Sequence, residues 1–338
     1  MNISVLGIDL AKNIFHVHGV DRAGKTVMRK KLMRAQLPAF IAQLRPCLIG
    51  MEACGSAHYW ARQFQAFGHT VKLMSPQFVK PYVKSNKNDT QDAEAICEAV
   101  TRPSMRFVAI KTVEQQDIQS LHRIRSGFVQ RRTALANQLR GLLNEYGIII
   151  PQGITQLPKY LPLLLENTEN RLTAMSCTFF AELYAQFITL DKQIKQYTRQ
   201  LEQLAKNLDV CQRLMNVPGV GALTATALIA AVNQGKEFKK GREMAAWLGL
   251  VPRQHSTGGK SKLLGISKRG DTYLRTLLIH GARSVIRHQE KQTTFKGSWV
   301  CGVIERRGKN KACVALANKN ARILWALLSK DVEYKAVA

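Results

Sequence analysis

The sequence predicts an α/β domain, then a long helical segment, then a mostly helical and strongly basic segment. Short apolar strands alternate with helices over residues 1–111. Over residues 112–210, apolar side chains recur three and four positions apart, as on one face of a helix. Lysine and arginine are concentrated in residues 211–338. At 338 residues the chain is long enough for two or three domains, each with its own core.

The first segment is expected to form a mixed sheet between helices. Three early strands are close together in sequence, as in a meander, and later strands alternate with helices. Strands are expected at 3–10, 14–20, 25–32, 47–51 and 70–74, and helices at 35–45, 57–67 and 88–100.

The second segment contains two amphipathic helices. In the first, apolar residues follow a three-four alternation that is interrupted at Arg125 and Arg132. The second has an uninterrupted a/d pattern typical of a coiled coil. This run is Phe180, Leu183, Phe187, Leu190, Ile194, Tyr197, Leu201, Leu204 and Leu208. The two helices could pair within one chain or join two subunits, and a heptad pattern does not distinguish these arrangements.

The charge distribution points to a nucleic-acid partner. The formal net charge is +27, with +9 in residues 1–111, +2 in 112–210 and +16 in 211–338. Basic excess at the two ends fits phosphate neutralisation, although a merely cationic protein has the same composition. The seven cysteines form no Cys-x-x-Cys pair, which favours reduced thiols in the cytoplasm. Neither a signal peptide nor a membrane span is expected, because residues 214–235 are uncharged but too polar.

A glycine-containing turn follows residue 210. Residues 214–224 are typical of a helix-hairpin-helix, in which amides near Gly219 and Gly221 face a backbone phosphate. An ordinary helix-helix turn would use the same residues.

Four carboxylates are candidate metal ligands: Asp9, Glu52, Asp89 and Asp92. Asp9 and Glu52 end apolar strands, and Asp89 and Asp92 are three apart on one helix face. Four acids that meet at one point repel each other unless a cation neutralises them, and Mg²⁺ or Mn²⁺ suits hard oxygen ligands. Singly, each acid could simply cap a helix or end a strand. Together with the strand order, they indicate a ribonuclease-H-like nucleotidyl transferase.

Several motifs resemble those of the DEDD transposases of insertion sequences. They are Gly-Ile-Asp-Leu-Ala-Lys at 7–12, Met-Glu-Ala-Cys-Gly at 51–55, Asn-Asp-Thr-Gln-Asp-Ala at 88–93, and the later Pro-Gly-Val-Gly, Gly-Leu-Val-Pro-Arg and Ser-Lys-Arg-Gly-Asp blocks. This family is similar to the Piv-type invertases and includes bridge-RNA-guided recombinases. The resemblance covers nearly the whole chain. It implies a RuvC-like domain at 1–111 whose catalytic tetrad is the four acids, a coiled coil at 112–210, and a transposase domain at 211–338 with a reactive serine.

The resemblance makes Ser256 the candidate nucleophile, within Gln254-His255-Ser256-Thr257-Gly258-Gly259-Lys260. Thr257 and Ser261 are neighbouring hydroxyls. A serine needs a base or electrostatic help to attack phosphorus. Nearby cations could supply that help or bind DNA, and a basic helix is expected at about 269–288. The candidate cations are Arg253, Lys260, Lys262, Lys268, Arg269 and Arg275. A P-loop is excluded, since position 254 is glutamine where that motif needs glycine.

The expected function is a DNA transposase or site-specific recombinase that excises and inserts its own insertion sequence. The resemblance further implies donor and target DNA, a structured guide RNA, and a homo-oligomer, a dimer or tetramer, whose active site combines two subunits. Two alternatives stay open. One is a RuvC-like endonuclease or junction resolvase in which Ser256 only binds, and the other is a noncatalytic nucleic-acid-binding protein.

Overall fold

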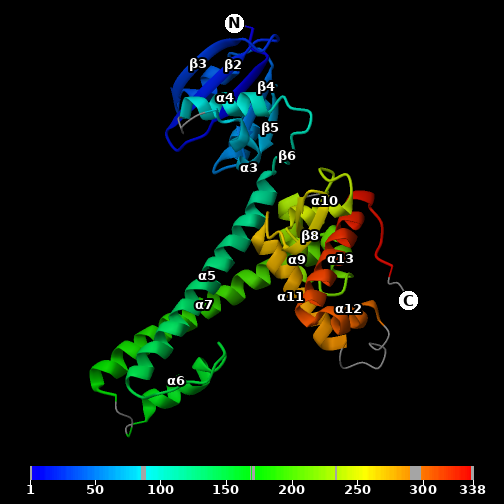
Figure 1. The fold of residues 1–338 in the computed structure, drawn as a ribbon. Coiled ribbons are helices and arrows are strands. Elements are labelled where there is room, and N and C mark those ends of the chain that lie inside the picture. The colour runs from blue at the N-terminus through cyan, green and yellow to red at the C-terminus, as the bar shows by residue number, and fades with distance from the viewer. Residues whose placement is uncertain are drawn as a thin grey trace. The chain divides into compact units, whose positions relative to one another are not determined.

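The computed structural model describes residues 2–84, 89–167, 169, 172–232, 234–289 and 298–335, with the side chains of Asp89 and Thr90 outside that description. The chain divides into two compact units, Met1–Val113 and Glu114–Ala338 (Figure 1). The helical segment and the C-terminal segment therefore belong to one unit.

The first unit contains a six-stranded mixed sheet in the order β3-β2-β1-β4-β5-β6. β4 pairs in parallel with both β1 and β5, and the other pairs are antiparallel. The strands are β1 (Val5–Asp9), β2 (Ile14–Val20), β3 (Thr26–Met33), β4 (Leu48–Glu52), β5 (Thr70–Met74) and β6 (Phe107–Val108). The expected mixed sheet is confirmed, and only the short β6 was not foreseen.

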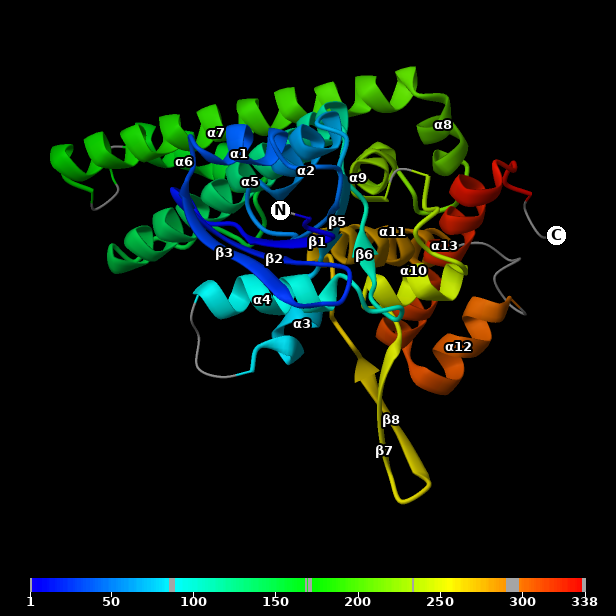
Figure 2. The ribbon, with the colours of Figure 1, turned by 90° about the horizontal axis from the view of Figure 1, so that it is seen from above.

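Helices cover both faces of this sheet (Figure 2). On one face, α1 (Leu37–Ala42) and α2 (Ala57–Ala66) pack on Ile8 and Met51, which are fully buried. On the other face lies α4 (Asp89–Ala99), which follows α3 (Pro76–Val79) and a 3₁₀ turn at Lys80–Tyr82. Because alternate strand residues face opposite sides, the apolar set of β1 and β4 is divided between two cores.

Two glycines let α4 lie directly on the sheet. Gly7 of β1 and Gly50 of β4 are paired in parallel register. A Cβ at Gly7 would be 2.2 Å from the carbonyl oxygen of Ala93, and one at Gly50 would be 2.8 Å from Cβ of Val100. The helix therefore crosses both strands at a distance that only glycine allows.

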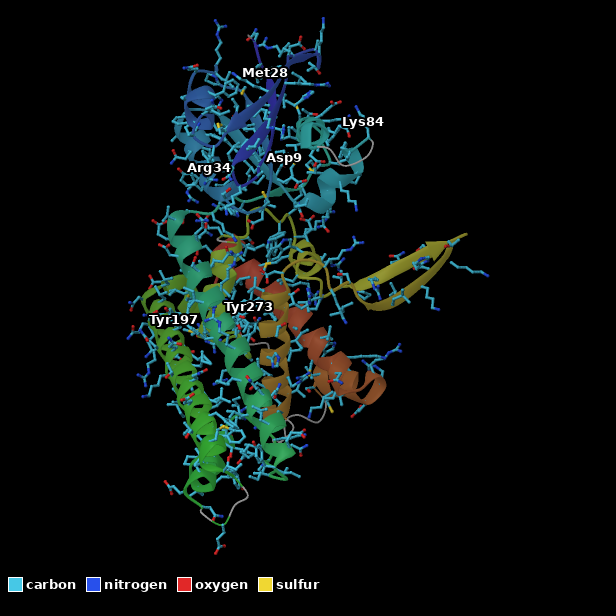
Figure 3. All side chains as sticks on the ribbon, turned by 90° about the vertical axis from the view of Figure 1, so that its left-hand side faces the viewer. Asp9, Met28, Arg34, Lys84, Tyr197 and Tyr273 are labelled. Carbon is cyan, nitrogen blue, oxygen red and sulfur yellow. The ribbon has the colours of Figure 1, made fainter. Side chains whose placement is uncertain are left out.

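In the second unit, the long helices α5 (Val113–Glu145) and α7 (Ala174–Asn207) run antiparallel side by side, with α6 (Leu157–Glu166) against their far ends (Figures 1 and 3). Both interruptions of the α5 pattern have partners on α7. The Arg132 guanidinium is 2.5 Å from Asp191, and Nε of Arg125 donates to Thr198 at 2.7 Å. The pairing in this structure is thus within one chain.

The rest of the unit is helical apart from one hairpin. Its elements are α8 (Asp209–Met215), α9 (Ala222–Val232), α10 (Gly241–Trp247), β7 (Pro252–Thr257), β8 (Lys260–Ile266), α11 (Thr272–Gln289), α12 (Trp299–Arg307) and α13 (Lys309–Lys330). Leu228, Leu248, Leu324 and their neighbours form its main core. Ile118 and Leu201 of the long helices pack with Ala230 of α9, which joins them to that core region. Within the described part of the chain, no helix has the length and apolarity to cross a membrane.

A directed chain of hydrogen bonds ties four helices of this unit together. The Thr226 hydroxyl donates its proton to the Ala222 carbonyl at 2.7 Å, so it accepts from Nε2 of His122 at 3.0 Å. The other nitrogen, Nδ1, then accepts from the Tyr273 hydroxyl at 3.0 Å. Arg125 in turn hydrogen-bonds to Tyr273, which is labelled in Figure 3. This partly buried network links α5, α9 and α11, and the hydrogen bond from Arg125 to Thr198 adds α7.

Candidate active site

Asp9 and Glu52 end adjacent parallel strands on the face that α4 covers. Ile8 pairs with Met51 in register, so Asp9 and Glu52 form the next pair along, with their strands ~4.8 Å apart. Each lies two residues beyond a glycine of the Gly7–Gly50 pair, and therefore on the same face. Asp92 directly precedes Ala93, whose carbonyl lies over Gly7. The glycine pair thus brings the first turn of α4 toward the acids that end β1 and β4.

The three described acids share an electrostatic environment. The pKa of Glu52 is raised by burial first, and then by the negative charges of Asp9 and Asp92. The pKa of the neighbouring Cys54 thiol is raised by burial and by the charges of Glu52 and Asp9. A raised carboxyl pKa with like-charged neighbours is typical of a site that gains stability when a cation binds.

The donor set has the chemistry that a divalent cation requires. Among residues whose side chains are described, no three His, Cys, Asp or Glu side chains are gathered as a metal-binding group. The backbone of Asp89 begins α4, and its side chain lies outside the described residues. Hard carboxylate oxygens on two strand ends and one helix turn suit Mg²⁺ or Mn²⁺. Such an ion would relieve the repulsion of Glu52 by Asp9 and Asp92.

His16 and Lys31 were missed by the sequence analysis and lie beside the acids. His16 pairs with Asp9 across β1 and β2, and Lys31 pairs with His16 across β2 and β3. The row therefore runs from a lysine through a histidine to Asp9 and Glu52. Strand alternation in residues 14–20 was the only sequence signal, and register was needed to align it with Asp9.

Ser256 lies in the second unit, in β7 of a two-stranded hairpin that extends away from the helices (Figure 2). Gly258 and Gly259 form its turn, with φ of +55° and +76°, as a two-residue type I′ turn requires. Residues 252–266, where no strands were predicted, thus form a two-stranded hairpin. Every residue of β7 is exposed, so no packing within the described chain constrains it.

The hairpin register separates Ser256 from two lysines expected to assist it. Ser256 pairs with Ser261, and Gln254 pairs with Leu263, so these four share one face. Lys260 and Lys262 pair with Thr257 and His255 and therefore lie on the opposite face. Of the two roles considered for these lysines, this register favours a phosphate contact over direct stabilisation of the oxygen of Ser256. They remain candidates for phosphate contact on the other face.

Gln254, which the sequence analysis gave no role, is the direct partner of Ser256. Its Nε2 donates to Oγ of Ser256 at 2.8 Å. Because i and i+2 share a face of a strand, the spacing itself was the available signal. Leu263 lies on the same face and is 65% exposed, so the surface around the serine is uncharged and partly apolar.

The other candidate cations differ in their surroundings. Arg253, Lys268 and Arg269 are exposed, and Lys268 has the left-handed φ of +54° in a loop against Gly249. For Arg275 the expectation of an open nucleic-acid contact is corrected, because the residue is only 8% exposed. Its guanidinium donates to the carbonyls of Leu248 and Arg269, both at 3.1 Å. Arg275 therefore holds the loop before α11 in place.

The turn between α8 and α9 has a packing explanation for its first glycine. Gly219 has a φ of +85°, and a Cβ there would be 2.8 Å from the carbonyl oxygen of Gly281 in α11. Nδ2 of Asn320 also donates to the carbonyl of Pro218 at 2.9 Å. Gly221 differs, since it is exposed with open space where a Cβ would be, at the start of α9. Of the two glycines, only Gly221 lies at an open helix start.

Two protein-family models match the chain. The model described as a transposase of the DEDD type found in IS110 matches residues 6–148. The model described as "Transposase IS116/IS110/IS902 family" matches residues 211–296. The first match includes all four acids, and the second includes Ser256 and Gln254.

Curated relatives match over almost the full length. A "Probable family 20 transposase" of Pseudomonas aeruginosa is 52% identical and is aligned over 99% of each chain. The "Transposase for insertion sequence element IS1111A" of Coxiella burnetii is 48% identical over 100% of this chain and 93% of its own. The "Transposase for insertion sequence element IS1328" of Yersinia enterocolitica is 43% identical over 98% of this chain and 99% of its own.

Proposed function

Because this chain belongs to the IS110-type DEDD transposase family, an enzyme family that cleaves and transfers DNA strands, we propose that it excises and inserts its own insertion sequence. We further propose that its acids act through Mg²⁺ or Mn²⁺ and that Ser256 is its nucleophile. The observation that carries the proposal is the alignment of Asp9 and Glu52 on adjacent strand ends under the first turn of α4. This arrangement concentrates negative charge at one edge of an otherwise basic protein.

In the first unit, Asp9, Glu52, Asp89 and Asp92 would hold the cation. A bound divalent ion supplies a Lewis acid that stabilises charge on the oxygens of a phosphodiester during in-line displacement. The chain's own contribution is to fix the carboxylates by register and by the close packing of α4 on Gly7. Acids on rigid strand ends lose little freedom when an ion and DNA bind.

In the second unit, Ser256 would attack phosphorus. The Oγ–P bond forms as the bond from phosphorus to one DNA oxygen breaks, and the serine proton leaves to a base or water. The products are a phosphoserine link to one DNA end and a hydroxyl on the other. Since the bond energy is kept in the phosphoester, a hydroxyl of another strand can reverse the step and join it. Gln254 orients Oγ through its 2.8 Å hydrogen bond.

The nucleic-acid partners follow from charge and family. Donor and target DNA are expected partners, and Arg253, Lys260, Lys262, Lys268, Arg269 and the open turn at Gly221 would contact their phosphates. A structured guide RNA and assembly into a dimer or tetramer are proposed from the family resemblance.

Covalent trapping tests the serine step against the endonuclease alternative. Wild-type protein, Ser256→Ala, Thr257→Ala and Asp9→Asn would be incubated with donor and target DNA and Mg²⁺, with and without co-purified RNA. We expect a protein–DNA adduct that is lost in Ser256→Ala and retained in Thr257→Ala, and recombination that is lost in Asp9→Asn. Wild-type cleavage by Ser256→Ala would contradict the nucleophile. Binding without any cleavage by the wild type would favour a noncatalytic protein.

A further inference from the structure

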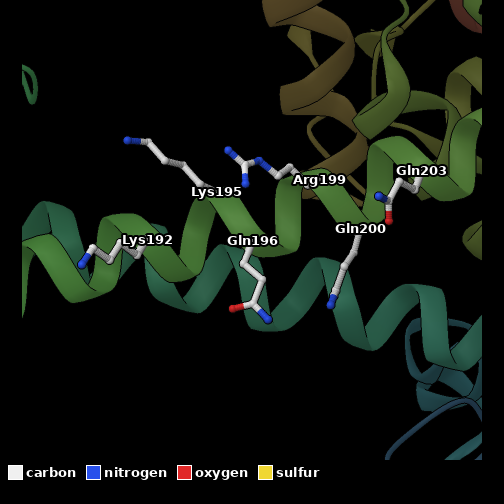
Figure 4. Close-up of a pocket in the computed structure, with 6 residues that line it drawn as sticks. All are labelled: Lys192, Lys195, Gln196, Arg199, Gln200 and Gln203. Carbon is white, nitrogen blue, oxygen red and sulfur yellow. The ribbon is translucent and has the colours of Figure 1, made fainter.

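The near-neutral helical segment conceals a strongly polarised surface on α7. A shallow hollow on this helix is lined by Lys192, Lys195, Gln196, Arg199, Gln200 and Gln203 (Figure 4). None of the three acids of α7, which are Glu182, Asp191 and Glu202, lines it. The hollow thus carries three positive side chains, whereas residues 112–210 as a whole have a net charge of only +2.

Two of the three cations are available to a ligand. Within the described ranges, Lys192 and Arg199 have no acidic partner, and both are exposed. Lys195 is 2.9 Å from Asp191, which also pairs with Arg132 of α5, so its charge is partly compensated. Surface lysines and arginines without a counter-ion attract anions at a distance of several ångströms.

The spacing of these groups fits a polyanion better than a single anion. From Lys192 to Arg199 the helix rises ~10 Å at 1.5 Å per residue. That length equals about three nucleotides of a strand at ~3.4 Å each. The amide of Gln196 lies between the cations, and those of Gln200 and Gln203 follow Arg199, so all three offer neutral donors and acceptors to sugar and phosphate oxygens. A repeating negative charge with polar groups between is the chemistry of a nucleic-acid backbone.

We propose that this α7 face binds the phosphodiester backbone of a nucleic acid, in addition to the contacts made by the C-terminal basic segment. The inference rests on the proposed function only in taking nucleic acid as the polyanion. The face contains no aromatic side chain and lies on a regular helix, so it tracks the backbone and does not read bases. DNA and RNA share this backbone, and the experiment separates them.

The experiment is a salt titration of binding by the full-length protein. Anisotropy would be measured with duplex DNA, duplex RNA and single-stranded RNA for the wild type and for Lys192→Gln/Arg199→Gln. Loss of two phosphate contacts reduces the slope of log K against log salt by ~1.8 for a duplex. We expect this reduction with at least one probe, and that probe identifies the strand that the face binds.

Matched variants separate charge from structure. Lys159→Gln removes an exposed lysine from α6 and is expected to leave the slope unchanged. Arg199→Lys keeps the positive charge and is expected to keep the wild-type slope of log K against log salt. If the double variant does not fold, the two single variants are measured in its place. Wild-type slopes for the double variant with all three probes would overturn the inference. If DNA cleavage and exchange persisted in that case, the proposed function would stand. Absence of wild-type binding to any probe would contradict both.

Discussion

Gly7 and Gly50 stand opposite each other in the parallel register of β1 and β4, and α4 crosses the sheet on this pair. The relationship links a stability feature to the candidate active site. The same helix that needs the glycines carries Asp92, and the same strands end two residues later at Asp9 and Glu52. A displacement of α4 would therefore move one acid relative to the other two.

Gly7→Ala is expected to destabilise the protein. Its Cβ would be 2.2 Å from the backbone oxygen of Ala93, so α4 must shift, at a cost of about 1–3 kcal/mol or more. Urea denaturation measures the change. Gly127→Ala is the control, because nothing lies within 4 Å of that position in α5. There alanine is expected to stabilise by up to ~1 kcal/mol. Equal stability of Gly7→Ala and wild type would contradict the close packing.

Cys54 is expected to report cation binding without any reaction on DNA. Burial, Glu52 and Asp9 raise its pKa, in that order, and the thiolate is the form that reacts with alkylating agents. Mg²⁺ bound by the acids would cancel the two charge effects, lower the pKa and speed alkylation at fixed pH. Peptide mass spectrometry after iodoacetamide treatment gives the rate at Cys54.

Two comparisons make the Cys54 experiment specific. Asp9→Asn should speed alkylation without Mg²⁺ and weaken the response to it. Cys177 and Cys301, which are partly exposed and far from the acids in sequence, serve as internal references. A Mg²⁺-independent rate at Cys54 in the wild type would argue against a cation at this edge of the sheet.

Gln254→Ala is expected to slow formation of the Ser256 adduct about two- to thirteenfold, as for loss of one hydrogen bond of about 0.5–1.5 kcal/mol. Single-turnover kinetics at saturating DNA measure the rate. Lys262→Ala, on the other face of the hairpin, should weaken DNA binding and leave this rate constant unchanged. The reverse pattern would show that the lysine, and not the glutamine, assists the serine.

His122 is expected to make stability fall in mild acid. Burial, and secondarily Arg125, lowers its pKa to about 4, from an ordinary value of 6.5. Between these values the unfolded chain binds the proton and the folded chain does not, so folding weakens as pH falls from 6.5 toward 4. The expected loss is about 3 kcal/mol over that window at ~1.4 kcal/mol per pH unit. His122→Gln should flatten this part of the profile, and an unchanged slope in that variant would exclude His122 as its source.

Much of the first unit was predictable because its signals are local. Strands at 14–20 and 70–74 have the predicted bounds, and α2 and α4 begin and end within one or two residues of expectation. Apolar alternation and helical periodicity can be recognised within a short run of consecutive residues. The position of each acid at the end of a strand or helix can be recognised in the same way. The hairpin at 252–266 was missed because its strands are polar and exposed. Strands with neither face buried lack the alternation of apolar and polar residues by which a strand is recognised.

The sequence by itself determined the residue types, their local periodicity and the excess of positive charge, and these were sufficient for the α/β class and the candidate acids. Only the tertiary structure decided which residues share a face. Strand register set His16 beside Asp9 and placed Lys260 and Lys262 on the face opposite Ser256, and helix packing buried Arg275. The reason is physical: propensity acts over a few neighbouring residues, whereas packing and strand register join residues far apart in the chain.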